Sequence, residues 1–231
     1  MQSSIVKYPD LVHAKRWDFD YFDPEYLEII DQINQSMWNV KTLGEIVSVL
    51  TDGQHGYLEH TSSGIPLLRT TNIFENEIRF DDVRYIAPEV HAEIKRSQLR
   101  PGDVLLTTIG SIGVAAVVDD SIGEANINQN LVKLTPKAEV NPYYLALFLN
   151  SSIGRIQIER TASKSVVPIV NYQRLRKVLI PLPPRPIQDH IAQVMQDAYT
   201  EANRLRIQAE NLVNKSKTSL ERMILGEEEV K

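Results

Sequence analysis

The sequence of 231 residues contains no cysteine. Disulfide bonds, thiolate zinc sites and cysteine nucleophiles are therefore excluded. Long apolar runs are also lacking: the uncharged stretch Val104–Val118 is shorter than the roughly 18 residues of a membrane span, and Gly110 and Gly113 interrupt it. Residues 1–20 lack the apolar core of a signal peptide. We therefore expect a cytoplasmic protein that does not contact membranes.

Motifs that carry chemistry are also missing from the sequence. It contains no GxSxG and no P-loop, and its five histidines show no metal-ligand spacing. Asp82 with Glu93 and Lys95 fits a metal-dependent nuclease pattern only loosely, and such short matches are common. We expect no catalytic residue, no metal site and no enzymatic activity in this chain.

The charge is unevenly distributed. The net charge of −5 argues against a sequence-blind nucleic-acid binder, which would usually be basic. Residues 1–40 hold three basic and seven acidic side chains, whereas residues 155–177 hold six basic and one acidic, a local net charge of +5 (six minus one). Such a patch favours contact with an anionic partner. The alternative is a solvated helix face.

Hydrophobic periodicity predicts a helical lead, a β-rich middle and a helical end. A short helix is expected over Pro24–Ile33, and residues 40–140 are expected to be mostly β, with Leu43–Leu50 ambiguous between helix and strand. Strands are expected at Ile65–Thr70, Ile78–Ile86, Val104–Ile109, Val114–Val118, Ile127–Leu134 and Val178–Ile180, and a short helix at Glu89–Arg96. Asn141 followed by Pro142 predicts the capped start of a helical stretch that runs to residue 160.

A proline-rich run, Pro181–Pro186, marks the clearest boundary and favours a stiff polyproline conformation. It matches the PxxP pattern of SH3 ligands, but a rigid linker is the simpler interpretation. The following Ile187–Leu225 has no proline or glycine, and its apolar or small residues recur at steps of three and four, which predicts one helix about 58 Å long. Because one small domain cannot cover so long an apolar face, we expect a partner helix. The pairing face is expected at Ile191, Val194, Ala198, Leu205 and Leu212.

These elements together predict an α+β fold: a mixed, mostly β domain with small helices, followed by a long C-terminal coiled-coil helix.

Several short segments occur in an order that resembles the specificity subunits of type I restriction-modification systems. Trp38–Ile46 is similar to the opening of their target-recognition domain, and Gly64–Ile73 to the segment after its first loop. Further similar pieces follow in the same order: Leu99–Thr107, Ile112-Gly113, Asn130–Leu134, Pro142–Leu145 and Ile180–Ile191. Asp20–Leu27 resembles the segment that precedes such domains. The resemblance covers residues 38–225.

The resemblance implies a domain organisation and a role. A lead segment with a short helix would occupy residues 1–37, a DNA-binding target-recognition domain 38–184, a long dimerisation helix 185–226 and an acidic tail 227–231. The subunit would do no chemistry and would hold no cofactor. It would select one half of a split site on double-stranded DNA for a methyltransferase subunit, which binds S-adenosylmethionine and flips out an adenine. A motor-nuclease subunit would be a further partner.

Family members usually carry this unit twice in tandem, and no second Trp-x-Val-x-x-Leu-Gly opening occurs here. The long helix would then pair with a second copy of the chain, and the two-fold dimer would read a palindromic, interrupted site. Two alternatives stay open. The partner would be a different specificity chain and the site asymmetric, or the chain would be a coiled-coil adaptor or decoy that binds and regulates the methyltransferase subunit.

Polar residues in the turns of the β-rich middle are the candidates for DNA contact under this resemblance. Glutamine and asparagine suit adenine, and arginine suits guanine. We expect base contacts from Gln54, His55, Arg69, Thr70, Thr71, Asn72, Ser111 and Lys164. We expect phosphate contacts from Arg155, Arg160, Arg174 and Arg176. For each of them the structural alternative is a capped turn or a surface charge.

Overall fold

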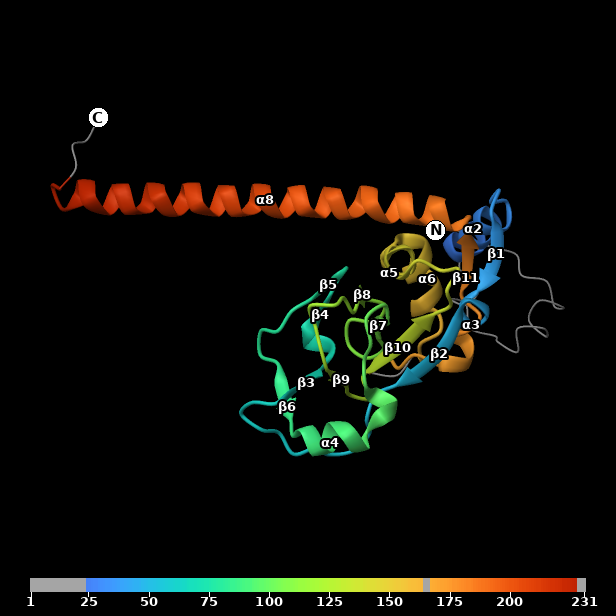
Figure 1. The fold of residues 1–231 in the computed structure, drawn as a ribbon. Coiled ribbons are helices and arrows are strands. Elements are labelled where there is room, and N and C mark those ends of the chain that lie inside the picture. The colour runs from blue at the N-terminus through green and yellow to red at the C-terminus, as the bar shows by residue number, and fades with distance from the viewer. Residues whose placement is uncertain (1–23, 164–166, 228–231) are drawn as a thin grey trace. The chain divides into compact units, whose positions relative to one another are not determined.

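The computed structural model describes residues 24–163 and 167–227 (Figure 1). The helices are α2 (Pro24–Asn34), α3 (Leu43–Ile46), α4 (Pro88–Glu93), α5 (Pro142–Asn150), α6 (Ser152–Glu159), α7 (Tyr172–Leu175) and α8 (Arg185–Ile224), with 3-10 turns η2 (Thr70–Asn72) and η3 (Lys95–Ser97). The strands are β1 (Asn39–Thr42), β2 (Val47–Asp52), β3 (Ile65–Leu68), β4 (Ile73–Phe74), β5 (Glu77–Ile78), β6 (Arg84–Ile86), β7 (Val104–Thr107), β8 (Ala115–Val117), β9 (Asn126–Ile127), β10 (Leu131–Pro136) and β11 (Leu179–Leu182). The chain divides into two compact units, residues 1–188 and 189–231. Within the described ranges, no helix has the length and apolarity to span a membrane.

The first unit is built around an antiparallel sheet with the strand order β2-β10-β7-β8. All four residues of β7 are buried, because the sheet is covered on both faces. Leu106 faces one apolar cluster and the adjacent Leu105 faces a second one. Strands covered on both faces appear in a sequence as continuous apolar runs, as Val104–Leu106 does.

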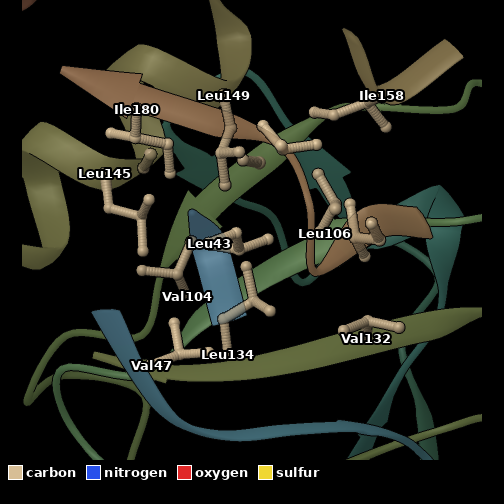
Figure 2. Close-up of a cluster of buried hydrophobic side chains, with 14 of the residues drawn as sticks. Leu43, Val47, Val104, Leu106, Val132, Leu134, Leu145, Leu149, Ile158 and Ile180 are labelled. Atoms are coloured by element: carbon tan, nitrogen blue, oxygen red, sulfur yellow. The ribbon is translucent and has the colours of Figure 1, made fainter. Parts of the chain in front are cut away.

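The larger apolar cluster joins this sheet to the helices that follow it. Figure 2 shows Leu106, Leu134, Leu145, Leu149 and Ile158 in this cluster, drawn from β7, β10, α5 and α6. Helix α5 packs on β7 and β8, and it starts where the Asn141 side chain accepts hydrogen bonds from the backbone N–H groups of residues 143 and 144. The N-cap asparagine and Pro142 therefore place the apolar face of α5 over the sheet.

The smaller apolar cluster lies under a second sheet with the order β6-β3-β9, in which β3 and β9 are parallel. Leu68 of β3 and Ile127 of β9 are fully buried in it. The hairpin β4-β5 is a separate sheet that contributes the buried Ile73 and the partly buried Ile78 to this cluster. The two sheets together put the ends of β2, β3, β7 and β9 close to one another, which positions the candidate site.

The first and last strands of the first unit are paired with each other. Strand β1 pairs antiparallel with β11, so Asn39 faces Leu182 across the ladder. The Tyr144 hydroxyl donates to the Pro181 carbonyl from beneath, and burial raises the pKa of this tyrosine to about 12. The Gln188 side chain, buried in the first turn of α8, accepts from the Asn141 N–H and donates to the Pro183 carbonyl.

Helix α8 runs for 40 residues without interruption and is followed by Gly226, whose φ of 75° is the left-handed conformation that often ends helices (Figure 1). Exposed apolar side chains recur along it. They include Ile191, Val194, Met195, Leu205, Leu212 and Leu220.

The α+β fold class is confirmed, and so are the helices expected at Pro24, after Asn141 and from about residue 187. The ambiguous Leu43–Leu50 is both a helix and a strand, α3 and then β2. Two expected strands were wrong in extent. Ile78–Ile86 is interrupted by a turn where Asp82 has a positive φ of 54°, and Ile127–Leu134 is divided into β9 and β10.

The expected polyproline linker was also wrong in extent. Pro181 lies in β11 and Pro186 lies in the first turn of α8, which leaves two residues between strand and helix. Proline is tolerated both at a strand edge and in a helix's first turn, so the run of prolines did not require an extended linker. Strand β1 and helix α7 were missed; α7 has only four residues, about one turn, which is too short to show a helical periodicity.

Candidate nucleic-acid interface

A tight turn between β9 and β10 lies at the centre of the candidate interface; we call Asn128–Asn130 the central turn. The Leu131 N–H donates to the Asn128 carbonyl at 3.2 Å, and the Asn130 N–H donates to the Asn128 side-chain oxygen at 3.2 Å. Asparagine favours this arrangement because its short side chain can bond to the backbone two residues ahead. These two hydrogen bonds define the backbone conformation of the turn.

Loops that are distant in sequence are hydrogen-bonded to this turn or to the residue before it. The Asn128 N–H donates to the Leu68 carbonyl at the end of β3, and the Gln54 N–H donates to the Ile127 carbonyl. The Asn130 carbonyl accepts from both the N–H and the hydroxyl of Thr108, which follows β7. We call the assembled loops 53–64, 69–72 and 108–113, together with the central turn, the loop cluster. It brings most of the expected base-contacting residues to one region.

Gln54 and His55 lie in the first loop of this cluster, directly after β2. Gly53 has no room for a Cβ against the Ile127 carbonyl, so only glycine lets the loop approach β9 this closely. The His55 ring nitrogen Nε2 hydrogen-bonds to the Asp52 carboxylate at 2.7 Å. His55 is exposed and Gln54 half-buried, and the Gln54 amide donates to the His55 carbonyl at 3.0 Å.

Arg69 to Asn72 form the second loop, and they divide into buried and exposed members. The Asn72 side chain has no exposed surface; its oxygen accepts the Arg69 N–H, and its amide donates to the Arg79 and Asp81 carbonyls. In this conformation Asn72 holds the loop together and cannot reach a base. The Arg69 guanidinium is bound to the Asp82 carboxylate at 2.9 Å.

Thr70 is half-buried and Thr71 is exposed. Neither hydroxyl makes a hydrogen bond to another residue within the described part of the chain, so both remain available to a ligand. Ser111 is exposed in the turn between β7 and β8, where its carbonyl accepts from the Thr107 hydroxyl. Gly110 and Gly113, with φ of 77° and 87°, give this turn its left-handed residues. Lys164 lies outside the described residues.

The four arginines expected at phosphates fall into two pairs. Arg155 and Arg160 lie at α6 and are half-buried: Arg155 binds the Glu75 carboxylate at 2.6 Å, and the Arg160 guanidinium lies 3.2 Å from the centroid of the Tyr26 ring. Arg174 and Arg176 are exposed at α7, which follows Val170, whose N–H donates to the Thr108 carbonyl of the loop cluster. Arg176 also donates to the Leu50 carbonyl at 3.5 Å. The first pair thus has a carboxylate and an aromatic ring as partners, whereas the side chains of the second pair are exposed.

Two parts of the interface were missed from the sequence. The central turn was hidden inside a run expected to be one strand, although its Asn-x-Asn spacing is typical of turns. Arg96 was missed because it contacts the site through Asp52, which is 44 residues away in the sequence. Burial raises the pKa of Tyr172, and a side-chain hydrogen bond with Thr108 and the charge of Arg96 act in the opposite direction.

Among the described residues, no group of three or more histidine, aspartate or glutamate side chains is placed to hold a metal ion.

Residues 35–214 match the model of the family described as the type I restriction modification DNA specificity domain. The chain is 24% identical over 178 residues to the type I restriction enzyme EcoBI specificity subunit of Escherichia coli, covering 75% of this chain and 37% of that protein. It is 28% identical over 189 residues to a putative type I restriction enzyme MjaX specificity subunit of Methanocaldococcus jannaschii, covering 79% and 44%. The chain thus spans less than half the length of these relatives.

Solved structures share the fold. A chain from a study of complex assembly and conformational transition of the type I R-M system superposes with a TM-score of 0.61 at 21% identity, covering 93% of this chain and 53% of that one. The HsdS subunit from Thermoanaerobacter tengcongensis superposes with a TM-score of 0.56 at 20% identity, covering 90% and 52%.

Proposed function

The chain belongs to the type I restriction modification DNA specificity domain family, and from this premise we propose that it is the DNA-reading, non-catalytic subunit of a type I adenine methyltransferase complex. Family membership supports recognition of a DNA target. We further propose that the DNA site is split, that the chain is a two-fold dimer, and that a methyltransferase subunit carrying S-adenosylmethionine docks on it.

The observation that carries the proposal is the loop cluster. Three loops that are separated in the sequence present polar side chains around one hydrogen-bonded turn. A protein that reads base edges needs donors and acceptors held in fixed positions, because ordering them on binding would cost affinity. Gln54, His55, Thr71 and Ser111 supply such groups, with Arg174 and Arg176 nearby for phosphates.

The proposed dimer rests on the pattern of α8. One set of residues recurs every seven positions, and a second set recurs in the same way four positions later, which is the spacing of a coiled-coil seam. The first set is Ile191, Ala198, Leu205, Leu212 and Ser219, and the second is Met195, Ala202, Ala209, Ser216 and Met223. Every member is apolar or small, so two such helices would pack closely. Val194 borders this seam.

The helix that covers this seam would come from a second copy of the chain. If the two-fold axis is perpendicular to the helices, the paired helices are antiparallel and one loop cluster lies at each end, so the DNA site would consist of two inverted half-sites with a spacer. The methyltransferase subunit would supply S-adenosylmethionine and the adenine pocket. A motor-nuclease subunit would join for restriction.

Mapping of methylated adenines in a host with and without this gene tests the reading role. The proposal predicts that one interrupted motif loses methylation in the deletion strain and regains it when the gene is restored. An unchanged methylation pattern in the deletion strain, with the methyltransferase subunit expressed, would contradict it.

Light scattering on the purified chain, alone and with its methyltransferase subunit, tests the dimer. Two copies of the chain in either sample are expected. A single copy in both samples would contradict the two-fold dimer, and it would leave a helix of a second recognition unit as the partner of α8.

A further inference from the structure

The carboxylate of Asp52 lies at the entrance to the first loop and is bound from two sides. One oxygen forms an ion pair with a terminal nitrogen of Arg96, and the other hydrogen-bonds to His55 Nε2 at 2.7 Å. The Arg96 Nε also donates to the Asp52 backbone carbonyl at 3.3 Å. The Asp52 side chain is only 13% exposed, whereas those of Arg96 and His55 are 58% and 64% exposed. A mostly buried carboxylate thus connects two exposed side chains.

The position of Arg96 is itself fixed by a polar network. Its neighbour Ser97 is buried and accepts a hydrogen bond from the Asn126 amide at 2.7 Å, and the Asn126 oxygen hydrogen-bonds to His91. Asn126 belongs to β9, directly before the central turn. The segment that carries Arg96 is therefore anchored to the same strand that anchors the loop cluster.

These contacts determine how the His55 ring is oriented. With Nε2 bound to Asp52, the other ring nitrogen, Nδ1, is left without a partner among the described residues. A histidine held at one nitrogen has a defined ring orientation and a defined tautomer, and its second nitrogen is presented outward. Without the carboxylate the ring would rotate freely between two glycines, Gly53 and Gly56.

We propose that Arg96 is a positioning residue for DNA reading: it fixes the Asp52 carboxylate, and this carboxylate orients His55 so that Nδ1 contacts one base pair of the half-site. The inference rests on the proposed function, because it needs a DNA site to be read. It assigns the selectivity at one position to a chain of three side chains, of which only His55 touches DNA.

The competing explanation is that Arg96 acts only as a positive charge near DNA or only as a structural tie. Lys95 provides a matched control, because it lies in the same 3-10 turn, is exposed, and has no recorded ion pair within the described part of the chain. Removal of either charge would weaken binding to all sequences alike. Only Arg96 would change the preference at one base pair.

The experiment uses the full chain with its methyltransferase subunit and a set of duplexes in which each position of the mapped half-site is varied in turn. Methylation rates are measured for the wild type, His55→Ala, Arg96→Ala, Lys95→Ala and the double variant His55→Ala/Arg96→Ala. Arg96→Lys and Asp52→Asn are also included. They preserve most of the local packing, so they keep the test possible if Arg96→Ala fails to fold.

We expect His55→Ala and Arg96→Ala to reduce the preference at the same position, each by about tenfold, which is the size of one good base contact. The double variant is expected to be no worse than His55→Ala at that position, because Arg96 acts only through His55. Asp52→Asn and Arg96→Lys should affect that position too, the latter more weakly, and Lys95→Ala should leave the preference intact.

Three results would overturn the inference. The first is that Arg96→Ala lowers the methylation of all duplexes uniformly, as Lys95→Ala does. The second is that His55→Ala and Arg96→Ala reduce the preference at different positions. The third is that the losses of preference of the two single variants multiply in the double variant. In each case the wild-type complex still reads its site, so the proposed function stands. If the wild-type complex itself shows no sequence preference, the proposed function fails and the inference falls with it.

Discussion

The loop cluster and helix α8 expose side chains of opposite character. In the loop cluster most exposed groups are polar, with the aromatic Tyr57 as the large exception, and the backbone beneath them is hydrogen-bonded to residues in or next to strands β3, β7 and β9. In α8 the exposed groups include large apolar ones, such as Leu205 at 51% and Leu212 at 67% exposed, spaced along one helix. Polar groups held in fixed positions suit recognition of a polar ligand, whereas an apolar seam stabilises the protein only when another apolar surface covers it.

This difference predicts that the two regions respond independently to substitution. Changes in α8 should alter assembly and leave the folding of the first unit intact, whereas changes in the core or in the loop cluster should alter the folding or the reading of the first unit.

The largest effect is expected from charges in the seam. Leu205→Arg with Leu212→Arg would bury unpaired charges in the paired helices, at a cost of several kcal/mol. We expect the dimer to dissociate in light scattering, with self-association weakened by roughly a hundredfold or more. Asn214→Arg, which lies on the other side of the helix, is the matched control. If the double variant stays dimeric, the apolar residues of α8 do not form the dimer seam, and the proposed difference between α8 and the loop cluster is wrong.

The next effect concerns the core of the first unit. Leu145 is fully buried in the larger apolar cluster (Figure 2), so Leu145→Ala should lower the free energy of unfolding by roughly 2–5 kcal/mol. Thermal unfolding of a monomeric seam variant that also carries the substitution measures this without the contribution of assembly. A loss below about 1 kcal/mol would mean that α5 is not packed as described.

A smaller loss is expected at Asn72. Because its side chain is buried and makes three hydrogen bonds to the backbone, Asn72→Ala should destabilise the first unit by roughly 1–3 kcal/mol. We expect methylation to fall uniformly across half-site variants, with no change in preference. Thr71→Ala, at an exposed neighbour, should leave stability unchanged. A position-specific change in preference from Asn72→Ala would show that this amide reaches DNA.

The smallest effect concerns Tyr144. Burial raises its pKa in the folded protein from the usual value of about 10 to about 12, so the contribution of its protonated hydroxyl to stability is fully present below about pH 10 and is lost as the pH rises towards 12. Tyr144→Phe should cost about 1 kcal/mol at neutral pH through the lost hydrogen bond to Pro181. The variant should also lose less stability than the wild type between these pH values, as denaturant titration would measure.

Local signals in the sequence were sufficient for helices α5 and α8. Asn141 and Pro142 mark the start of α5, and the periodicity of residues 187–225 marks α8, because both signals depend on neighbours within one or two turns. The same holds for β7, whose apolar run is long enough to be recognised.

The candidate site depends on pairings that no local pattern encodes. Asn72 and Thr71 are adjacent polar residues of similar size, and only the packing around β3 buries one and exposes the other. Arg96 meets Asp52 across 44 residues because η3 and the end of β2 are both next to β9. Turn chemistry therefore indicates which residues lie in loops, but not which of them face a ligand.

The most direct test of the separation between reading and spacing is to lengthen α8 by one heptad. Duplicating Ala202–Gln208 keeps both sets of seam residues in register and adds about 10.5 Å to the helix. Methylated adenines are then mapped in a host that carries only this variant. We expect unchanged half-site sequences and a spacer longer by about three base pairs at 3.4 Å each. Altered half-site bases, or an unchanged spacer with methylation intact, would contradict it.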